Sequence, residues 1–176
     1  MLASLTQIVS PISLSVTATH ILVVLPNQAG APAKTADKPG ESLHFLGKSA
    51  LEALLSRRKM DLSGIGQAPA AANLESGALC VWVAVDLSKS PFEQQTLIRK
   101  AVQPLLEESP AEINIAVYGD EQEKAALAQL ALYVAWVNGA PLPSRKTGKK
   151  FVRGRMNWAA VWAKPGHAEP AFPSPT

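Results

Sequence analysis

Between residues 74 and 137, apolar strand-like runs alternate with capped helix starts, and this alternation limits the fold more than any other feature. Residues 79–85 form a continuous apolar run, which is typical of a strand in a sheet covered on both faces. A second apolar run occupies residues 113–118, and helix-start signals follow the two runs at Ser90 and Asp120. Strands that alternate with helices usually pair in parallel, because each helix returns the chain to the end of the sheet at which the previous strand began. We therefore expect an α/β domain with a mostly parallel central sheet flanked by helices.

The N-terminal part of the chain continues this pattern. Residues 12–16 alternate with period two, and residues 20–25 form a more buried strand-like run. The prolines and glycines of residues 26–41 predict a loop. Leucines at helical spacing then predict a helix over residues 43–59, and residues 61–73 are expected to be irregular.

Two longer helices are predicted in the second half. The helix that begins at Ser90 should end or kink near Pro104, because a proline inside a helix lacks the N–H donor and clashes with the preceding turn. The helix that begins at Asp120 should stop at Asn138-Gly139. The side chains that we assign to its buried stripe are Ala125, Leu127, Leu130, Ala131, Val134 and Val137.

Composition places the chain among globular proteins, since 47% of its 176 residues are hydrophobic and 18% are charged. We expect no membrane association, because no apolar run approaches the roughly 20 residues of a membrane span. The N-terminus also has no secretory pattern, and the single cysteine, Cys80, has no disulfide partner. A cytoplasmic location is the simplest expectation.

Charge divides the chain into two parts. Residues 1–140 carry a formal charge of −3 and residues 141–176 carry +6, which gives the +3 of the whole chain. We therefore assign residues 1–140 to the α/β domain and residues 141–176 to a basic, proline-containing tail. Six cations followed by Trp158 could neutralise phosphates and stack a base of a nucleic acid, although a solvated linker has the same composition. They are Arg145, Lys146, Lys149, Lys150, Arg153 and Arg155.

Acidic side chains stand where ligands bind in open α/β sheets. Asp86 follows the run 79–85 and Asp120 follows the run 113–118, so both are predicted at the carboxyl ends of strands. Each could line a ligand crevice. The alternatives are that Asp120 caps its helix and that Asp86 begins a loop.

Other motifs carry little chemistry. Gly47-Lys48-Ser49 matches the end of a phosphate-binding loop, but Ser42 stands where the motif needs its first glycine, and the tripeptide falls inside a predicted helix. The histidines have no further ligands at metal-binding spacing, and Cys80 has no activating base. We expect no metal site, no catalytic site and no cofactor.

Five segments follow one another in a recognisable order and spacing, namely 51–64, 81–85, 92–102, 113–118 and 125–136. Together they resemble the N-terminal domain of leucine (cytosol) aminopeptidases. The resemblance covers about residues 10–150 and implies a macro-domain-like fold. In that family, a separate C-terminal domain carries the two metal ions, and its Asn-Thr-Asp-Ala-Glu-Gly-Arg motif is absent from this sequence.

The resemblance implies a non-catalytic accessory or interaction domain with a role in assembly or regulation. Its expected partners are a second copy of the chain or an aminopeptidase catalytic domain. A macro-like fold also leaves ADP-ribose or nucleotide binding open, because residues 70–73 end in Asn73 and resemble the Ala-Ala-Asn signature of macrodomains. Nucleic-acid binding through residues 145–155 is the remaining alternative.

Overall fold

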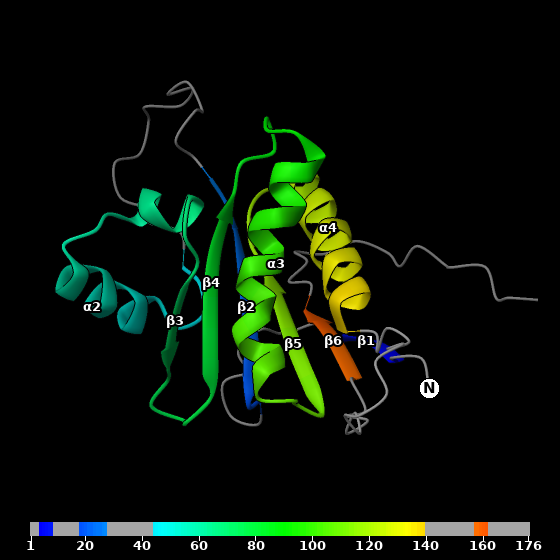
Figure 1. Cartoon of the computed structure of the whole chain (residues 1–176), viewed down its shortest axis with the longest axis horizontal. Coiled ribbons are helices and arrows are strands. Elements are labelled where there is room, and N and C mark those ends of the chain that lie inside the picture. The colour runs from blue at the N-terminus through cyan, green and yellow to red at the C-terminus, as the bar shows by residue number, and fades with distance from the viewer. Residues whose placement is uncertain (1–3, 9–17, 28–43, 140–156, 162–176) are drawn as a thin grey trace, which may run out of the picture.

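The computed structural model describes residues 4–8, 18–27, 44–139 and 157–161. Their strands form one sheet in the order β1-β6-β5-β2-β4-β3 (Figure 1). In chain order, the strands are β1 (Ser4–Ile8), β2 (His20–Pro26), β3 (Ala70–Asn73), β4 (Leu79–Val85), β5 (Glu112–Val117) and β6 (Asn157–Val161). The helices are α2 (Lys48–Arg58), α3 (Pro91–Glu107) and α4 (Glu121–Gly139), with a short 3₁₀ helix, η3, at Leu62–Gly66.

The sheet is mostly parallel, as the sequence predicts. Strands β1, β6, β5, β2 and β4 pair in parallel with their neighbours, and only β3 runs antiparallel, against β4. Helices α3 and α4 pack on one face and α2 packs on the other (Figure 1). The described residues therefore form the expected mixed α/β architecture.

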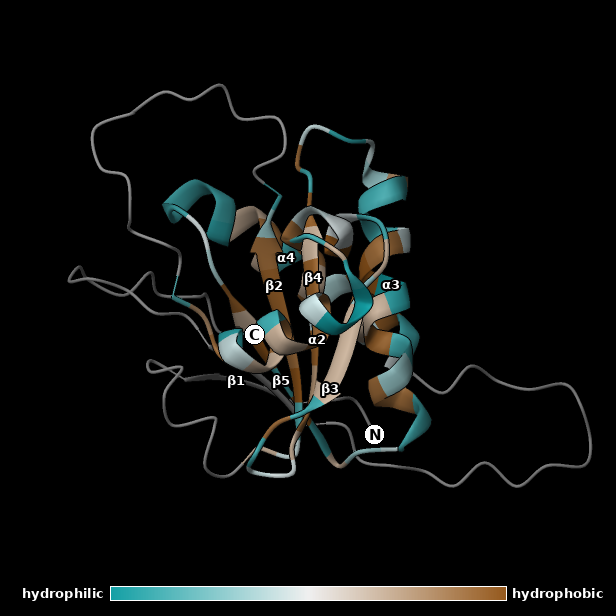
Figure 2. Cartoon of the chain, turned by 90° about the vertical axis from the view of Figure 1, so that its left-hand side faces the viewer, coloured by the Kyte–Doolittle hydropathy of each residue, from teal (hydrophilic) through white to brown (hydrophobic). Residues whose placement is uncertain are grey.

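Strand β4 shows why this segment is continuously apolar. Val81, Val83 and Val85 belong to the core under α3 and α4. Cys80 and Trp82 belong to the core under α2, on the opposite face. Both faces of the strand are covered, so a polar residue has no place on either side. Figure 2 shows the brown, hydrophobic strands β2 and β4 behind α2.

The predicted break at Pro104 is wrong. Helix α3 runs through Pro104 to Glu107, and its only interruption is the missing N–H of that proline. Ile98, Ala101 and Leu105 are fully buried on both sides of the proline. This packing fixes the helix path more strongly than the lost hydrogen bond disturbs it.

Three smaller differences concern burial and boundaries. Residues 61–73 are less irregular than expected, because they contain η3 and β3. Helix α2 starts at Lys48, five residues later than predicted from residue 43. Ala125 and Val137 were assigned to the buried stripe of α4, but Ala125 is exposed and Val137 is 49% exposed.

Strand β6 lies within the segment that charge composition assigned to a tail. It pairs with β5 on one side and β1 on the other, so residues 157–161 complete the sheet. Residues 145–155 thus belong to the connection between α4 and β6. The six basic residues, the predicted strand at 12–16 and most of the predicted loop at 26–41 lie outside the described residues.

Candidate ligand crevice and interaction surface

The carboxyl end of β2 is the point where the chain reverses its direction across the sheet. From β2, the connection through α2 leads to β4 on one side, whereas the connection from β4 through α3 leads to β5 on the other side. Because α2 and α3 cover opposite faces of the sheet, the loops that follow β2 and β4 lead away from each other at this point. In open α/β sheets, such a switch point is where ligands bind.

Two shallow hollows, with volumes of about 230 and 220 Å³, open at the carboxyl ends of these strands. Val85 and Asp86 line both of them. Phe92, Lys89 and Lys100 line the first hollow, and Asn27 and Glu123 line the second. Each is smaller than the roughly 300–1,000 Å³ of most small-molecule pockets. The crevice is therefore large enough only for a small group or for one end of a larger ligand.

Asp86 lies at the carboxyl end of β4, as predicted, and its carboxylate is held by the following turn. Its Oδ1 accepts hydrogen bonds from the Ser88 hydroxyl at 2.6 Å and the Ser88 backbone N–H at 2.9 Å. These two bonds, the hydroxyl first, lower the pKa of Asp86 below its ordinary value. The Gln94 side-chain amide donates to the carbonyls of Asp86, Leu87 and Lys89, which fixes the loop beside it. Asp86 is thus both a loop residue and a crevice residue.

Asp120 serves as a helix cap. Its Oδ1 accepts from the Glu123 backbone N–H at 2.8 Å, and its own N–H donates to Glu123 Oε2 at 2.9 Å. Glu123, which the sequence did not single out, lines the second hollow in its place. Asn73 lies far from both acids, because β3 is antiparallel and Asn73 pairs with Leu79 at the opposite end of β4. The structure brings Asp86 and Glu123 together and separates Asn73 from them.

Gly47-Lys48-Ser49 lies at the N-terminus of α2 instead of inside it, and a packing contact explains its glycine. Gly47 has φ +69°, and a Cβ built there would lie 2.7 Å from Trp82 Cζ2 and 2.8 Å from Leu74 Cδ2. The neighbouring Leu46 carbonyl accepts a hydrogen bond from Trp82 Nε1 at 2.9 Å, and its N–H donates to the Tyr118 hydroxyl at 3.0 Å. The segment before α2 is thereby fastened to the sheet through buried Trp82.

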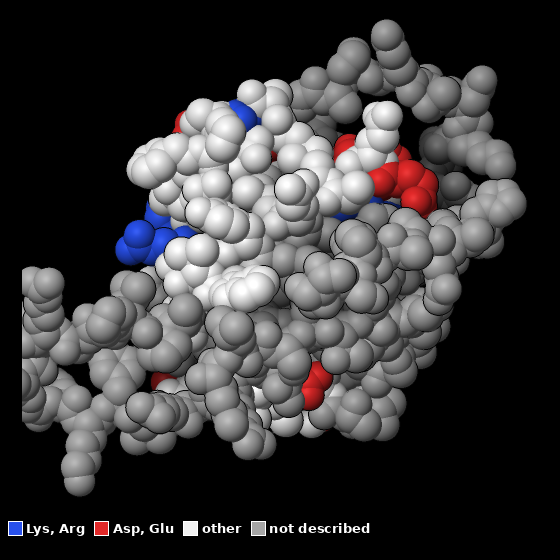
Figure 3. Space-filling model, turned by 90° about the vertical axis from the view of Figure 1, so that its right-hand side faces the viewer, with Lys and Arg blue, Asp and Glu red and all other residues white. Residues whose placement is uncertain are grey.

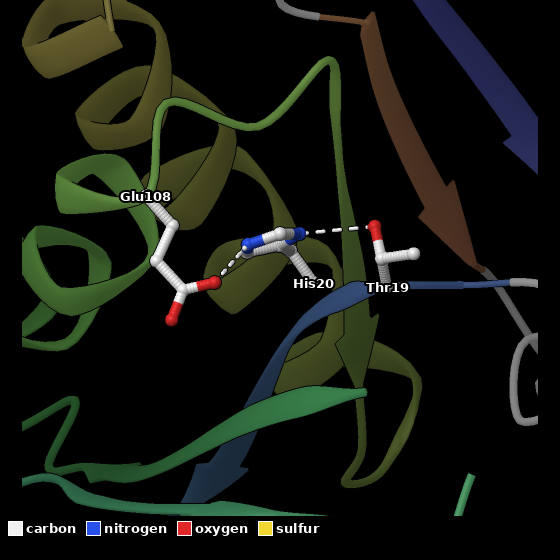
Figure 4. A network of polar contacts seen from close by, with 3 residues as sticks. All are labelled: Thr19, His20 and Glu108. Atoms are coloured by element: carbon white, nitrogen blue, oxygen red, sulfur yellow. Dashed lines mark hydrogen bonds and ion pairs between the residues drawn. The ribbon is translucent and has the colours of Figure 1, made fainter. Parts of the chain in front are cut away.

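The opposite end of the strands holds a polar contact that sequence spacing could not reveal. His20, at the start of β2, contacts Glu108 at the end of α3, with 2.9 Å between Nε2 and Oε2 (Figure 4). Its other ring nitrogen lies 3.0 Å from the Thr19 hydroxyl. Residues 20 and 108 are distant in sequence, so only the fold brings them together. The pair joins the end of α3 to the sheet.

Helix α4 exposes a face without charges. From Ala125 to Gly139 the helix contains no Asp, Glu, Lys or Arg. Tyr133, Trp136 and Val137 are 55%, 53% and 49% exposed. By contrast, the exposed face of α3 carries Arg99, Lys100 and Glu107. Figure 3 shows a broad white, uncharged area on the side of the molecule where α4 lies. Contiguous exposed apolar residues of this kind mark interaction sites.

Among the described residues, no group of three or more histidine, cysteine or acidic side chains is placed to hold a metal ion. Burial raises the pKa of the Cys80 thiol far above its ordinary value. The same part of the chain contains no helix of the length and apolarity that a membrane span requires.

Comparison with known proteins gives a likeness of fold. No family model and no curated protein matches the chain. A solved structure of a tomato leucine aminopeptidase mutant matches with a TM-score of 0.50 and 15% sequence identity. The match covers 93% of this chain and 33% of the aminopeptidase chain, so this chain spans about a third of that protein's length. At this identity, the likeness shows that the two share a fold and supports only a weak resemblance to a domain of that family.

Proposed function

We propose that this chain is a non-catalytic interaction domain of the aminopeptidase N-terminal type, which acts by binding another protein through α4. The observation that carries the proposal is the exposed, uncharged face of α4 with Tyr133, Trp136 and Val137. A helix that faced only water would carry charged residues on its outer face, as α3 does. Aromatic residues are also the side chains that contribute most to protein interfaces.

The fold likeness supports this role, because the aligned part of the aminopeptidase is one section of a longer chain. The small size of the two hollows favours protein binding over a catalytic pocket. We propose that the partner is a second copy of the chain or an aminopeptidase catalytic domain.

Sedimentation velocity on the purified full chain tests the proposal, first by itself and then mixed with an aminopeptidase catalytic domain. We expect a complex in at least one case, and Trp136→Ser should weaken it strongly. Phe92→Ser is the matched control, since Phe92 is 78% exposed but lies on α3 beside the crevice. No complex in either sample, or equal weakening of the complex by the two variants, would contradict the role of α4.

The enzymatic part of the proposal has its own measurement. The full chain, supplied with manganese or zinc, should not hydrolyse leucine amide, because the proposal gives it no metal-bound nucleophile. Turnover that persists after removal of contaminating peptidase and is abolished by a chelator would overturn this part.

Nucleotide binding is a second candidate, and the position of Asp86 between the two hollows favours it. The carboxylate could accept a hydrogen bond from a base amine while Lys89 or Lys100 meets a phosphate. Thermal shift with ADP-ribose, compared between the full chain and Asp86→Ala, tests this candidate. A shift that the variant retains would place the ligand elsewhere.

A further inference from the structure

The connection between β1 and β2 has to cross the sheet. Both strands belong to one sheet and run parallel, because every pair in the order β1-β6-β5-β2 is parallel. The chain therefore returns from the carboxyl end of β1 to the amino end of β2 and passes β6 and β5 on the way. The 11 residues between Ile8 and His20 form this connection.

The hand of the other connections selects the face that it crosses. Connections between parallel strands of one sheet are almost always right-handed, so two connections that move in opposite directions across the sheet lie on opposite faces. From β4 to β5 and from β5 to β6 the chain moves toward β1, through α3 and α4 on one face (Figure 1). From β1 to β2 it moves away from β1, as it does from β2 through α2 to β4. The right-handed path therefore lies on the α2 side of the sheet.

The last residues of the connection support this choice. Ala18 packs against the core under α2, on the same side of the sheet. The Thr19 carbonyl accepts a hydrogen bond from the Leu79 N–H at 2.8 Å, which fixes Thr19 at the amino end of β4. The chain thus enters β2 from the α2 side.

A buried side chain on that side needs a hydrogen-bond partner. Asn114 is 3% exposed, and it shares the α2 side of β5 with Ala116, since Ile113 and Ile115 belong to the opposite core. Among the described residues, none forms a hydrogen bond with its side-chain amide, and α2 packs toward β3. An amide buried without a partner is unfavourable, because it loses its hydrogen bonds to water. A peptide group offers the donor and the acceptor that the amide requires.

We infer that residues 9–17 cross the α2 side of the sheet over β6 and β5, and that their backbone pairs with the Asn114 amide. The first part of the chain then completes the domain on that side and leaves no open sheet face there for a partner. The role proposed for α4 does not enter this inference, so the two stand or fall separately.

The length of the connection agrees with this path. The crossing descends about 17 Å of strand and moves sideways over three strand spacings of about 4.8 Å, which gives a diagonal of about 22 Å. A continuous helix from Ile8 to His20 would reach only about 18 Å, whereas an extended chain reaches up to about 40 Å. A mostly extended segment therefore crosses with length to spare for the rise over the side chains of the sheet. The period-two pattern of residues 12–16 is typical of such a segment.

The sign of a stability change tests the pairing of Asn114. Leucine has nearly the shape of asparagine, so Asn114→Leu removes both hydrogen-bonding functions with little change in volume. In urea unfolding, the ratio of folded to unfolded chain should fall about 5- to 30-fold, because the peptide group paired with Asn114 is left buried and unsatisfied. Asn73→Leu, at an exposed position of β3, is the matched control and should change the ratio less than about threefold. An unchanged or higher ratio for Asn114→Leu would overturn the pairing.

Nuclear magnetic resonance on the full natural chain locates residues 9–17 directly and needs no substitution. We expect nuclear Overhauser contacts between the side-chain amide protons of Asn114 and protons of residues 9–17. The side-chain amide of exposed Asn73 should show no contact with those residues. Contacts of residues 9–17 with α3 or α4, or no contact with Asn114, would overturn the path on the α2 side.

Discussion

Replacement of Gly47 by alanine tests whether packing explains the glycine of the Gly47-Lys48-Ser49 motif. Two costs add in this variant. The left-handed conformation, with φ +69°, costs a residue with a Cβ about 1–2 kcal/mol. The new Cβ would also lie 2.7 Å from Trp82 Cζ2, and Trp82 is fully buried and cannot move without disturbing the core. Overpacking of this kind costs about 1–3 kcal/mol.

Gly77→Ala is the matched control, because it isolates the first cost. Gly77 has a similar positive φ of +83°, but a Cβ there would meet no atom within 4 Å. Urea unfolding of both variants gives the difference in the free energy of unfolding. We expect Gly77→Ala to lose about 1–2 kcal/mol and Gly47→Ala to lose about 2–5 kcal/mol. Equal losses would refute the argument that contact with Trp82 requires glycine at position 47.

Three further outcomes follow from the fold. Pro104→Ala should raise the free energy of unfolding by about 1–2 kcal/mol, because it restores the helix donor, and urea unfolding that shows destabilisation would contradict this. Cys80 should react with a thiol reagent only after unfolding, because burial raises the pKa of its thiol, and fast labelling of the native chain would disprove the burial. Glutamine at all six basic positions of residues 145–155 should abolish salt-sensitive binding to DNA or RNA, and unchanged affinity would exclude that segment as the binding site.

The sequence predicts three of the six described strands, β2, β4 and β5, because these strands are strongly apolar over their whole length. Their burial on both faces leaves a signal that short windows detect. Strand β3 was missed because its four residues are small and it lies at an edge, where the apolar signal is weak. The break at Pro104 was wrong because a local preference was outweighed by the packing of α3 against β4 and α4.

The candidate site was less predictable, because it depends on the order and direction of the strands in the sheet. Asp86 directly follows β4, so its predicted position at the carboxyl end of that strand is confirmed. Asn73 was chosen for its likeness to the macrodomain signature, and its separation from Asp86 follows from the antiparallel direction of β3, which cannot be read from four residues. The exposed, uncharged face of α4 could have been predicted from the sequence, since the helix contains no charged residue after Lys124. An apolar residue such as Val137 was instead assigned to the core.

Strand β6 changes how the basic segment must be tested. Residues 145–155 connect α4 to a strand that pairs with both β1 and β5, so removal of everything after Ala140 would also remove a strand from inside the sheet. Such a truncated chain could lose nucleic-acid binding simply because it no longer folds. Substitution of the six basic side chains keeps β6 and changes only charge. The same reasoning separates the two surfaces, because polyanion binding should weaken steeply with salt, while association through the uncharged part of α4 after Lys124 should not.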